Sequence, residues 1–124
     1  MTGTAPEEDE RLLHFLSGKS EHTLALFHYF IAEYQKLGSI IVQPTKTIIG
    51  ISSARRRIAW VTQLGKNFIH IVFPLKQPYQ DNLCFTKVAQ VPGSASQFNH
   101  HFRMLHLEDI NEEVRNYMLL AYEQ

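Results

Sequence analysis

The chain has 124 residues but only one cysteine, Cys84, and no apolar run near the ~18 residues of a transmembrane helix. A single cysteine cannot form an internal disulfide, and without a C-x-x-C partner it does not indicate zinc. We expect Cys84 to pack as a small hydrophobic residue in a reducing compartment. The N-terminal residues MTGTAPEEDER are acidic and polar, unlike a signal peptide. The sequence therefore predicts a cytoplasmic protein that does not enter a membrane.

Familiar catalytic motifs are also lacking. The chain contains no G-x-S-x-G elbow, no Walker loop, no G-x-G-x-x-G and no H-x-H or H-E-x-x-H pattern. Between Tyr34 and Leu107 the only carboxylate is Asp81, so the clustered acids of a magnesium-dependent enzyme or a glycosidase are missing there. We expect no metal and no cofactor, and the sequence favours a binding module over an enzyme.

The order of predicted elements indicates an α+β fold. Residues 1–18 form an acidic tail with a short helix, and residues 19–124 form a single domain. Ser20 caps a longer helix that ends before Gly38, and Asp109 with Glu112 offers a capping-box start for a last helix to Tyr122. Between these helices lie β-branched runs typical of an antiparallel sheet of about five or six strands. The runs are SIIV, TKTIIGI, RRIAWVTQL, NFIHIVFPL, LCFTKVAQV and QFNHHFRML, with a hairpin turn at Gly65-Lys66-Asn67.

The charges are segregated along the chain although they sum to zero. Nine basic residues accompany Asp81 between Tyr34 and Leu107, whereas the flanks hold the other eleven acids and three basic residues. The pattern predicts a basic sheet beside acidic helices.

Three consecutive arginines, Arg55 to Arg57, precede the apolar run IAWV. Simple strand alternation places Arg56 on the face of Trp60 and Arg57 on the opposite face. Two interpretations stay open. In the first, the arginines bind an anion, and Trp60 is available for stacking. Alternatively, they keep an edge strand free of aggregation or pair with helix acids, namely Glu7, Glu8, Glu112 or Glu113.

Two of the seven histidines stand out as candidates for a site. His101 alternates with Asn99 and Arg103, and His70 lies on another predicted strand. His100 alternates with apolar residues and is more typical of a satisfied core histidine. The full set of candidate ligand-binding residues is Lys46, Arg57, Trp60, His70, His100, His101 and Arg103.

Several segments together resemble the bacterial domain of unknown function family 5655. They are PTKTIIGI, RRRIAWV, NFIHIVFPL and HHFRM followed by LEDINEEVRNYMLLAY, and the likeness spans about residues 18–122. The resemblance implies that four polar residues occupy recurrent family positions: Lys46, Arg57, His100 and Arg103. Ile58 departs from the family pattern, which more often has an aromatic residue there. The family has no established activity, so the resemblance names no reaction.

The charge map leads to a functional expectation. We expect a binding module for an anionic ligand on the basic sheet surface, which includes a phosphate-bearing small molecule, a nucleic acid or an acidic protein segment. The alternative is a hydrolase or nuclease-associated enzyme that uses His101 with Arg57 and Lys46. An open sheet edge further predicts a monomer or a weak homodimer.

Overall fold

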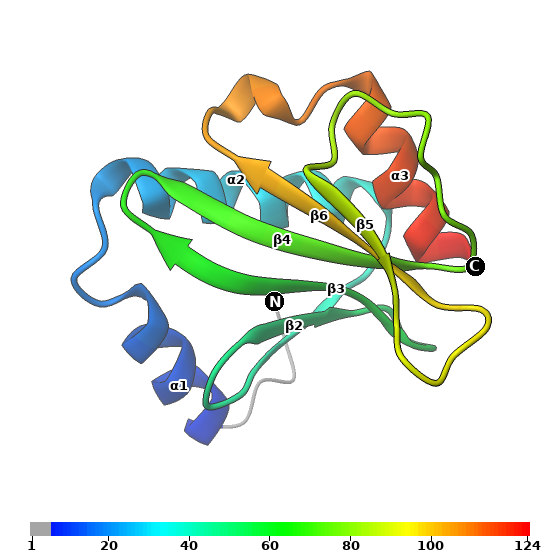
Figure 1. Cartoon of the computed structure of the whole chain (residues 1–124). Coiled ribbons are helices and arrows are strands. Elements are labelled where there is room, and N and C mark those ends of the chain that lie inside the picture. Colours follow the sequence, from blue (N-terminus) through cyan, green and yellow to red (C-terminus); the bar gives the residue numbers. More distant parts are fainter. Residues whose placement is uncertain (1–5) are drawn as a thin grey trace.

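The structure is a computed structural model that describes residues 6–124, with side chains from residue 9 onward. The first five residues of the predicted acidic tail lie outside the described residues. The helices are α1 (Pro6–Leu16), α2 (Glu21–Leu37), the short 3-10 helix η1 (Leu107–Asp109) and α3 (Glu112–Glu123). The strands are β1 (Ile41–Pro44), β2 (Ile49–Ser52), β3 (Arg57–Gly65), β4 (Phe68–Leu75), β5 (Lys87–Gln90) and β6 (Phe98–Met104) (Figure 1).

The six strands form one antiparallel sheet with the order β1-β2-β3-β4-β6-β5. Consecutive strands pair as hairpins from β1 to β4, and β6 then inserts between β4 and β5. The α+β fold with two N-terminal helices and one C-terminal helix, predicted from the sequence, is confirmed. The edge strands are β1 and β5, so the arginine run does not guard an edge, because β3 lies between β2 and β4.

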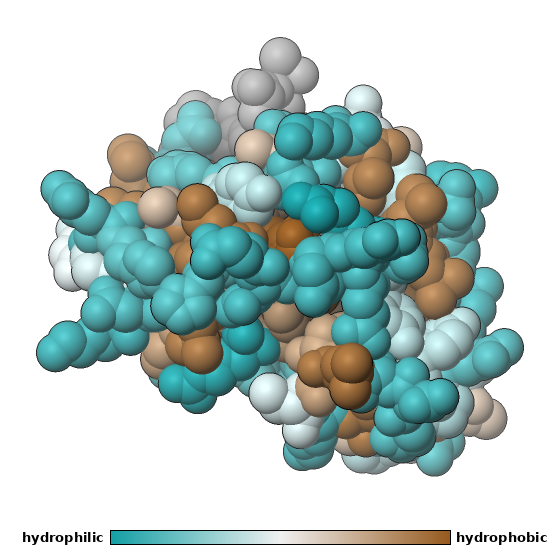
Figure 2. Space-filling view, turned by 90° about the horizontal axis from the view of Figure 1, so that it is seen from above, coloured by the Kyte–Doolittle hydropathy of each residue, from teal (hydrophilic) through white to brown (hydrophobic). Residues whose placement is uncertain are grey.

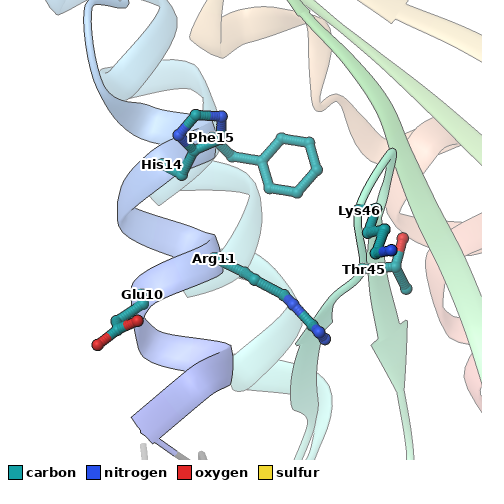
Figure 3. A pocket seen from close by; sticks show the side chains of 6 residues that line it. All are labelled: Glu10, Arg11, His14, Phe15, Thr45 and Lys46. Carbon is teal, nitrogen blue, oxygen red and sulfur yellow. The ribbon is translucent and has the colours of Figure 1, made fainter.

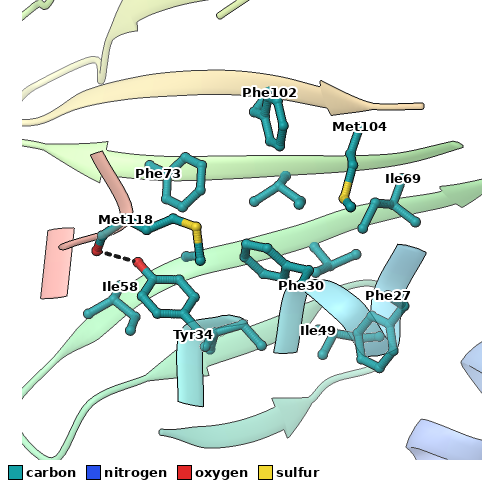
Figure 4. Close-up of a cluster of buried hydrophobic side chains, with 14 of the residues drawn as sticks. Phe27, Phe30, Tyr34, Ile49, Ile58, Ile69, Phe73, Phe102, Met104 and Met118 are labelled. Carbon is teal, nitrogen blue, oxygen red and sulfur yellow. Dashed lines mark hydrogen bonds between the residues drawn. The ribbon is translucent and has the colours of Figure 1, made fainter. Parts of the chain in front are cut away.

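Helices α2 and α3 pack on one face of the sheet, which we call the covered face; the opposite face is the open face. Phe30 and Tyr34 of α2 and Met118 of α3 are fully buried against Phe73 of β4 (Figure 4). The Tyr34 hydroxyl donates a hydrogen bond of 2.9 Å to the backbone oxygen of Met118. This buried bond joins α2 to α3, so both helices are held on the covered face.

The start of α2 is tied to the β3–β4 turn. Ser20 caps the helix, because its Oγ accepts from the backbone N–H of Thr23 at 3.1 Å. The Thr23 hydroxyl in turn donates to the Gly65 carbonyl at 2.8 Å and accepts from the Asn67 N–H at 2.9 Å. Asn67 has φ 62°, in the left-handed region that asparagine tolerates better than most residues. The predicted cap and the predicted hairpin turn are both confirmed.

Three predicted boundaries differ from the structure. Residues 45–48 form the β1–β2 turn, where Thr45 Oγ1 accepts from the Ile48 N–H at 3.1 Å. Residues 83–86 form a loop rather than the first half of β5, because the Asn82 side chain accepts from their backbone N–H groups. Asn111, rather than Asp109, caps α3 by accepting from the Val114 N–H at 2.9 Å. In each case a side chain that bonds to the backbone nearby ends the regular pattern.

The surface seen from above is mainly hydrophilic, and its hydrophobic side chains form separate small patches (Figure 2). The most exposed large apolar side chains come from different elements: Leu13 on α1 and Leu83 in the loop before β5. Of the helices that the structure describes, none combines the length and the apolar character needed to cross a bilayer.

Candidate functional site

The open face of the sheet gathers most of the predicted site residues, and two β-bulges decide which ones. In β3, Arg57 pairs with Ser52 and Trp60 pairs with Gly50, with a register shift between them. Since Ser52 and Gly50 are two residues apart in β2, they share a face, and so do Arg57 and Trp60. The predicted simple alternation, which separated Arg57 from Trp60, is therefore wrong.

A second bulge, at Thr62, aligns the next residues of β3. Val61 pairs with Ile71, and Gln63 pairs with His70. The strand register across the sheet then defines the open-face side chains. They are Ile41, Gln43, Ser52, Arg57, Trp60, Gln63, Phe68, His70, Val72, Pro74, Lys87, Ala89, Asn99, His101 and Arg103.

Arg57 lies flat on the open face at its β2 side. A Cβ atom at Gly50 would overlap the Arg57 guanidinium, so the guanidinium lies directly over this glycine. Its Nε donates to Ser52 Oγ at 3.0 Å, and Nη2 donates to Gln43 Oε1 at 3.3 Å. The guanidinium carbon is 5.8 Å from the centre of the Trp60 ring. Arg57 is thus held by neutral polar groups, and its positive charge is not neutralised by them.

His70 and His101 form a hydrogen-bonded pair in the middle of the open face. Nε2 of His70 lies 2.9 Å from Nδ1 of His101, so one nitrogen donates and the other accepts. Burial lowers the pKa of His70, and the charge of Arg103 lowers it further. Burial also lowers the pKa of His101, with smaller contributions in the same direction from neighbouring basic groups. Both shifts favour the neutral form of the imidazoles.

Two cations flank this histidine pair. Arg103 is directly opposite His70 in the β4–β6 register, and Lys87 is directly opposite His101 in the β5–β6 register. Side chains directly opposite one another on antiparallel strands are roughly 5 Å apart at Cβ. We call these four residues, His70, Lys87, His101 and Arg103, the His-Arg-Lys cluster.

Arg103 also has a defined position on an aromatic ring. Its guanidinium carbon lies 4.0 Å from the centre of the Phe68 ring. The Phe68 ring itself lies over Gly65, where a Cβ atom would overlap it. The stack of glycine, ring and guanidinium orients Arg103 without neutralising its charge.

The six strands contain no aspartate or glutamate. The two ion pairs of the described residues both involve Glu33 of α2, with Lys36 at 2.6 Å and Arg115 at 3.0 Å. The hypothesis that the arginine run pairs with helix acids thus finds no support among the described side chains. Arg55 does reach α3, but its contact there is the backbone oxygen of Glu123 at 3.3 Å.

Two predicted site residues lie away from the open face. His100 is fully buried on the covered face, where its Nε2 accepts from the Tyr79 N–H at 3.1 Å and Nδ1 lies 2.9 Å from the Phe98 carbonyl. Alternation turns His100 toward the core, as its apolar neighbours in the sequence predicted, so it is not grouped with the open-face candidates. Lys46 lies in the β1–β2 turn.

Lys46 lines a separate open cavity of about 490 Å³ between this turn and α1 (Figure 3). Arg11 reaches from α1 toward the turn, whereas the Glu10 carboxylate points away from it (Figure 3). The enzyme hypothesis requires Lys46 to lie beside Arg57 and His101, and the structure does not group them.

The described residues offer neither a reactive cysteine nor a group of metal ligands. Cys84 is partly buried, and burial together with the charge of Glu113 raises the pKa of its thiol to about 12. Such a thiol is not a reactive nucleophile at neutral pH. Among the described residues, no three His, Cys, Asp or Glu side chains are grouped so that they could hold a metal ion.

Sequence reasoning missed Lys87, Gln43 and Phe68. The KVAQ run was recognised as a strand, but its neighbour in the sheet cannot be read from the local pattern. Once β5 is known to pair with β6, Lys87 falls opposite His101. Scans of the chain against protein-family models, curated proteins and solved structures found no match. The resemblance to family 5655 therefore stays a prediction.

Proposed function

We propose that this protein is a binding module whose open face takes up a compact anion, with phosphate as the group recognised. The observation that carries the proposal is the His-Arg-Lys cluster on a sheet whose strands have no carboxylate. Arg103 and Lys87 raise the electrostatic potential around a hydrogen-bonded pair of neutral imidazoles, and no acid on these strands offsets it. A phosphate placed there gains two charge-assisted contacts and a nearby N–H donor.

A compact anion suits the charge distribution better than a long polyanion. Eleven of the twelve acidic residues lie outside the central segment that carries the strands. A long nucleic acid that extends beyond the cluster would meet these acids, whereas a single phosphate group would not.

The test measures phosphate binding by calorimetry and thermal shift at low and moderate salt, with inorganic phosphate as the probe. We expect stabilisation of the wild type that weakens as salt rises. Arg103→Ala removes a charge-assisted contact of about 1.5–3 kcal/mol, which corresponds to roughly ten- to hundredfold weaker binding. Arg56→Ala removes the same charge from an exposed residue outside the open face and serves as the matched control. Equal loss in both variants, or no binding by the wild type, contradicts the proposal.

Hydrolase or nuclease-associated chemistry at His101 is the second candidate. The observation in its favour is that His70 fixes the Nδ1 side of the His101 ring, as a partner does for a general base. The six strands have no carboxylate, and the open-face Ser52 hydroxyl lies on β2, three strands away from β6. A panel of hydrolase and nuclease assays on the wild type and on His101→Ala distinguishes the two candidates, because only catalysis predicts turnover that the variant loses.

A further inference from the structure

The open face contains a partly exposed tryptophan, Trp60, in line with the His-Arg-Lys cluster. A single row of paired residues crosses the sheet as Gly50, Trp60, Val72, His101 and Lys87. Trp60 is partly exposed, whereas Val72 between Trp60 and His101 is only 4% exposed. The row therefore has an aromatic side chain at one end and a cationic group at the other, with a covered valine between Trp60 and His101.

The second aromatic residue of the open face is already occupied. Phe68 lies between Gly65 beneath it and the Arg103 guanidinium 4.0 Å above it. Trp60 is different, because the nearest guanidinium, that of Arg57, is 5.8 Å from the ring centre and is bonded to Ser52 and Gln43. Arg57 therefore approaches the Trp60 ring more loosely than Arg103 covers Phe68, and the partly exposed indole is the aromatic group of this face that a planar ligand can reach.

The spacing of the row matches a ligand with two chemically distinct ends. Trp60 and His101 are separated by two strand spacings, roughly 10 Å at the backbone. In a nucleoside monophosphate, one ribose separates a planar base from a phosphate, which gives a comparable span. A phosphate without a base would use the cluster and leave Trp60 in contact with water.

We propose that the open face binds a nucleoside monophosphate unit, with the base stacked on Trp60 and the phosphate held by the His-Arg-Lys cluster. This inference rests on the proposed function and names its ligand class. A free nucleotide and one nucleotide of a single strand present the same two groups. The tests below separate these sources.

The first experiment uses the only tryptophan of the chain as its probe. Trp60 fluorescence is titrated with adenosine monophosphate, ribose 5-phosphate and inorganic phosphate, and binding of each is measured in parallel by calorimetry. We expect adenosine monophosphate to quench the fluorescence saturably and to bind about tenfold or more tighter than ribose 5-phosphate, since a stacked base contributes that much. Tighter binding of a short single-stranded oligonucleotide than of adenosine monophosphate would identify the strand as the source.

Variants separate the base subsite from the phosphate subsite. Trp60→Leu should abolish the preference for adenosine monophosphate over ribose 5-phosphate while it leaves phosphate binding in place. Trp60→Phe retains a smaller aromatic ring opposite Val72 and should keep part of the preference. Arg103→Ala should weaken all three ligands, and Arg56→Ala should weaken none.

Two outcomes overturn the inference. One is equal affinity of the wild type for adenosine monophosphate and ribose 5-phosphate. The other is an unchanged preference in both Trp60 variants. In either case, the proposed function would still be supported if the wild type binds phosphate and Arg103→Ala weakens that binding. If no probe binds at all, both the nucleotide inference and the proposed function are contradicted.

Discussion

Replacing Tyr34 with phenylalanine removes one oxygen atom from the centre of the core. Tyr34 is fully buried, and its hydroxyl donates the 2.9 Å bond to the Met118 carbonyl that links α2 to α3 (Figure 4). Burial also raises the pKa of this phenol, which remains neutral throughout the physiological range. The change therefore deletes one neutral hydrogen bond and leaves the ring packing on Phe30 intact.

The expected loss of stability depends on whether the Met118 carbonyl keeps another hydrogen-bond donor in the variant. The Met118 carbonyl belongs to α3, where the helix supplies it with a donor, the backbone N–H four residues later, so the variant does not create a fully unpaired buried carbonyl. The expected loss is about 1 kcal/mol in the free energy of unfolding, the usual contribution of a buried neutral hydrogen bond. For a domain of this size that loss lowers Tm by about 4 °C.

Tyr122→Phe is the matched control. Its hydroxyl donates to the Ser39 carbonyl at 3.0 Å, in an exposed position where water can replace it. Urea unfolding followed by Trp60 fluorescence gives both free energies, provided that the denaturant slope is unchanged. The reasoning fails if Tyr34→Phe is as stable as the wild type, or if the Tyr122 variant loses as much stability as the Tyr34 variant.

Two further predictions concern the dependence of stability on pH. Hydrogen bonds from Lys36 and Arg115 to Glu33 lower the pKa of its carboxyl, so Glu33 contributes stability above its ordinary pKa, and this contribution is lost as the pH falls through the folded-state value. Glu33→Gln should therefore destabilise the protein at pH 7 by an amount that shrinks toward acid pH in urea unfolding, and a constant difference would contradict this. The pKa values of His70 and His101 are lowered by folding, so the unfolded chain takes up protons first as the pH falls below about 6.5. The wild type should lose stability across that range, and His101→Gln should lose less; equal slopes would show that the pair does not titrate as the structure implies.

The sequence by itself determined the elements and the distribution of charge. Side-chain chemistry within a few residues sets a helix cap such as Ser20 or a turn such as residues 65–67, so such features can be predicted without knowledge of the fold. The same holds for the strands without carboxylates, because the identity of each residue fixes its charge. The basic character of the sheet was therefore predictable, and so was its flanking by acidic helices.

Only the tertiary structure decided which of these residues meet. His70 and His101 are 31 residues apart, and they touch because β6 inserts next to β4, a choice made by the packing of the whole sheet. The register shift in β3 moved Arg57 to the face of Trp60, against the local alternation. Alternation is a property of one strand, whereas bulges and strand order depend on pairing between distant segments. The candidate site results from that pairing. Most of its residues could therefore be predicted from the sequence, whereas their arrangement could not.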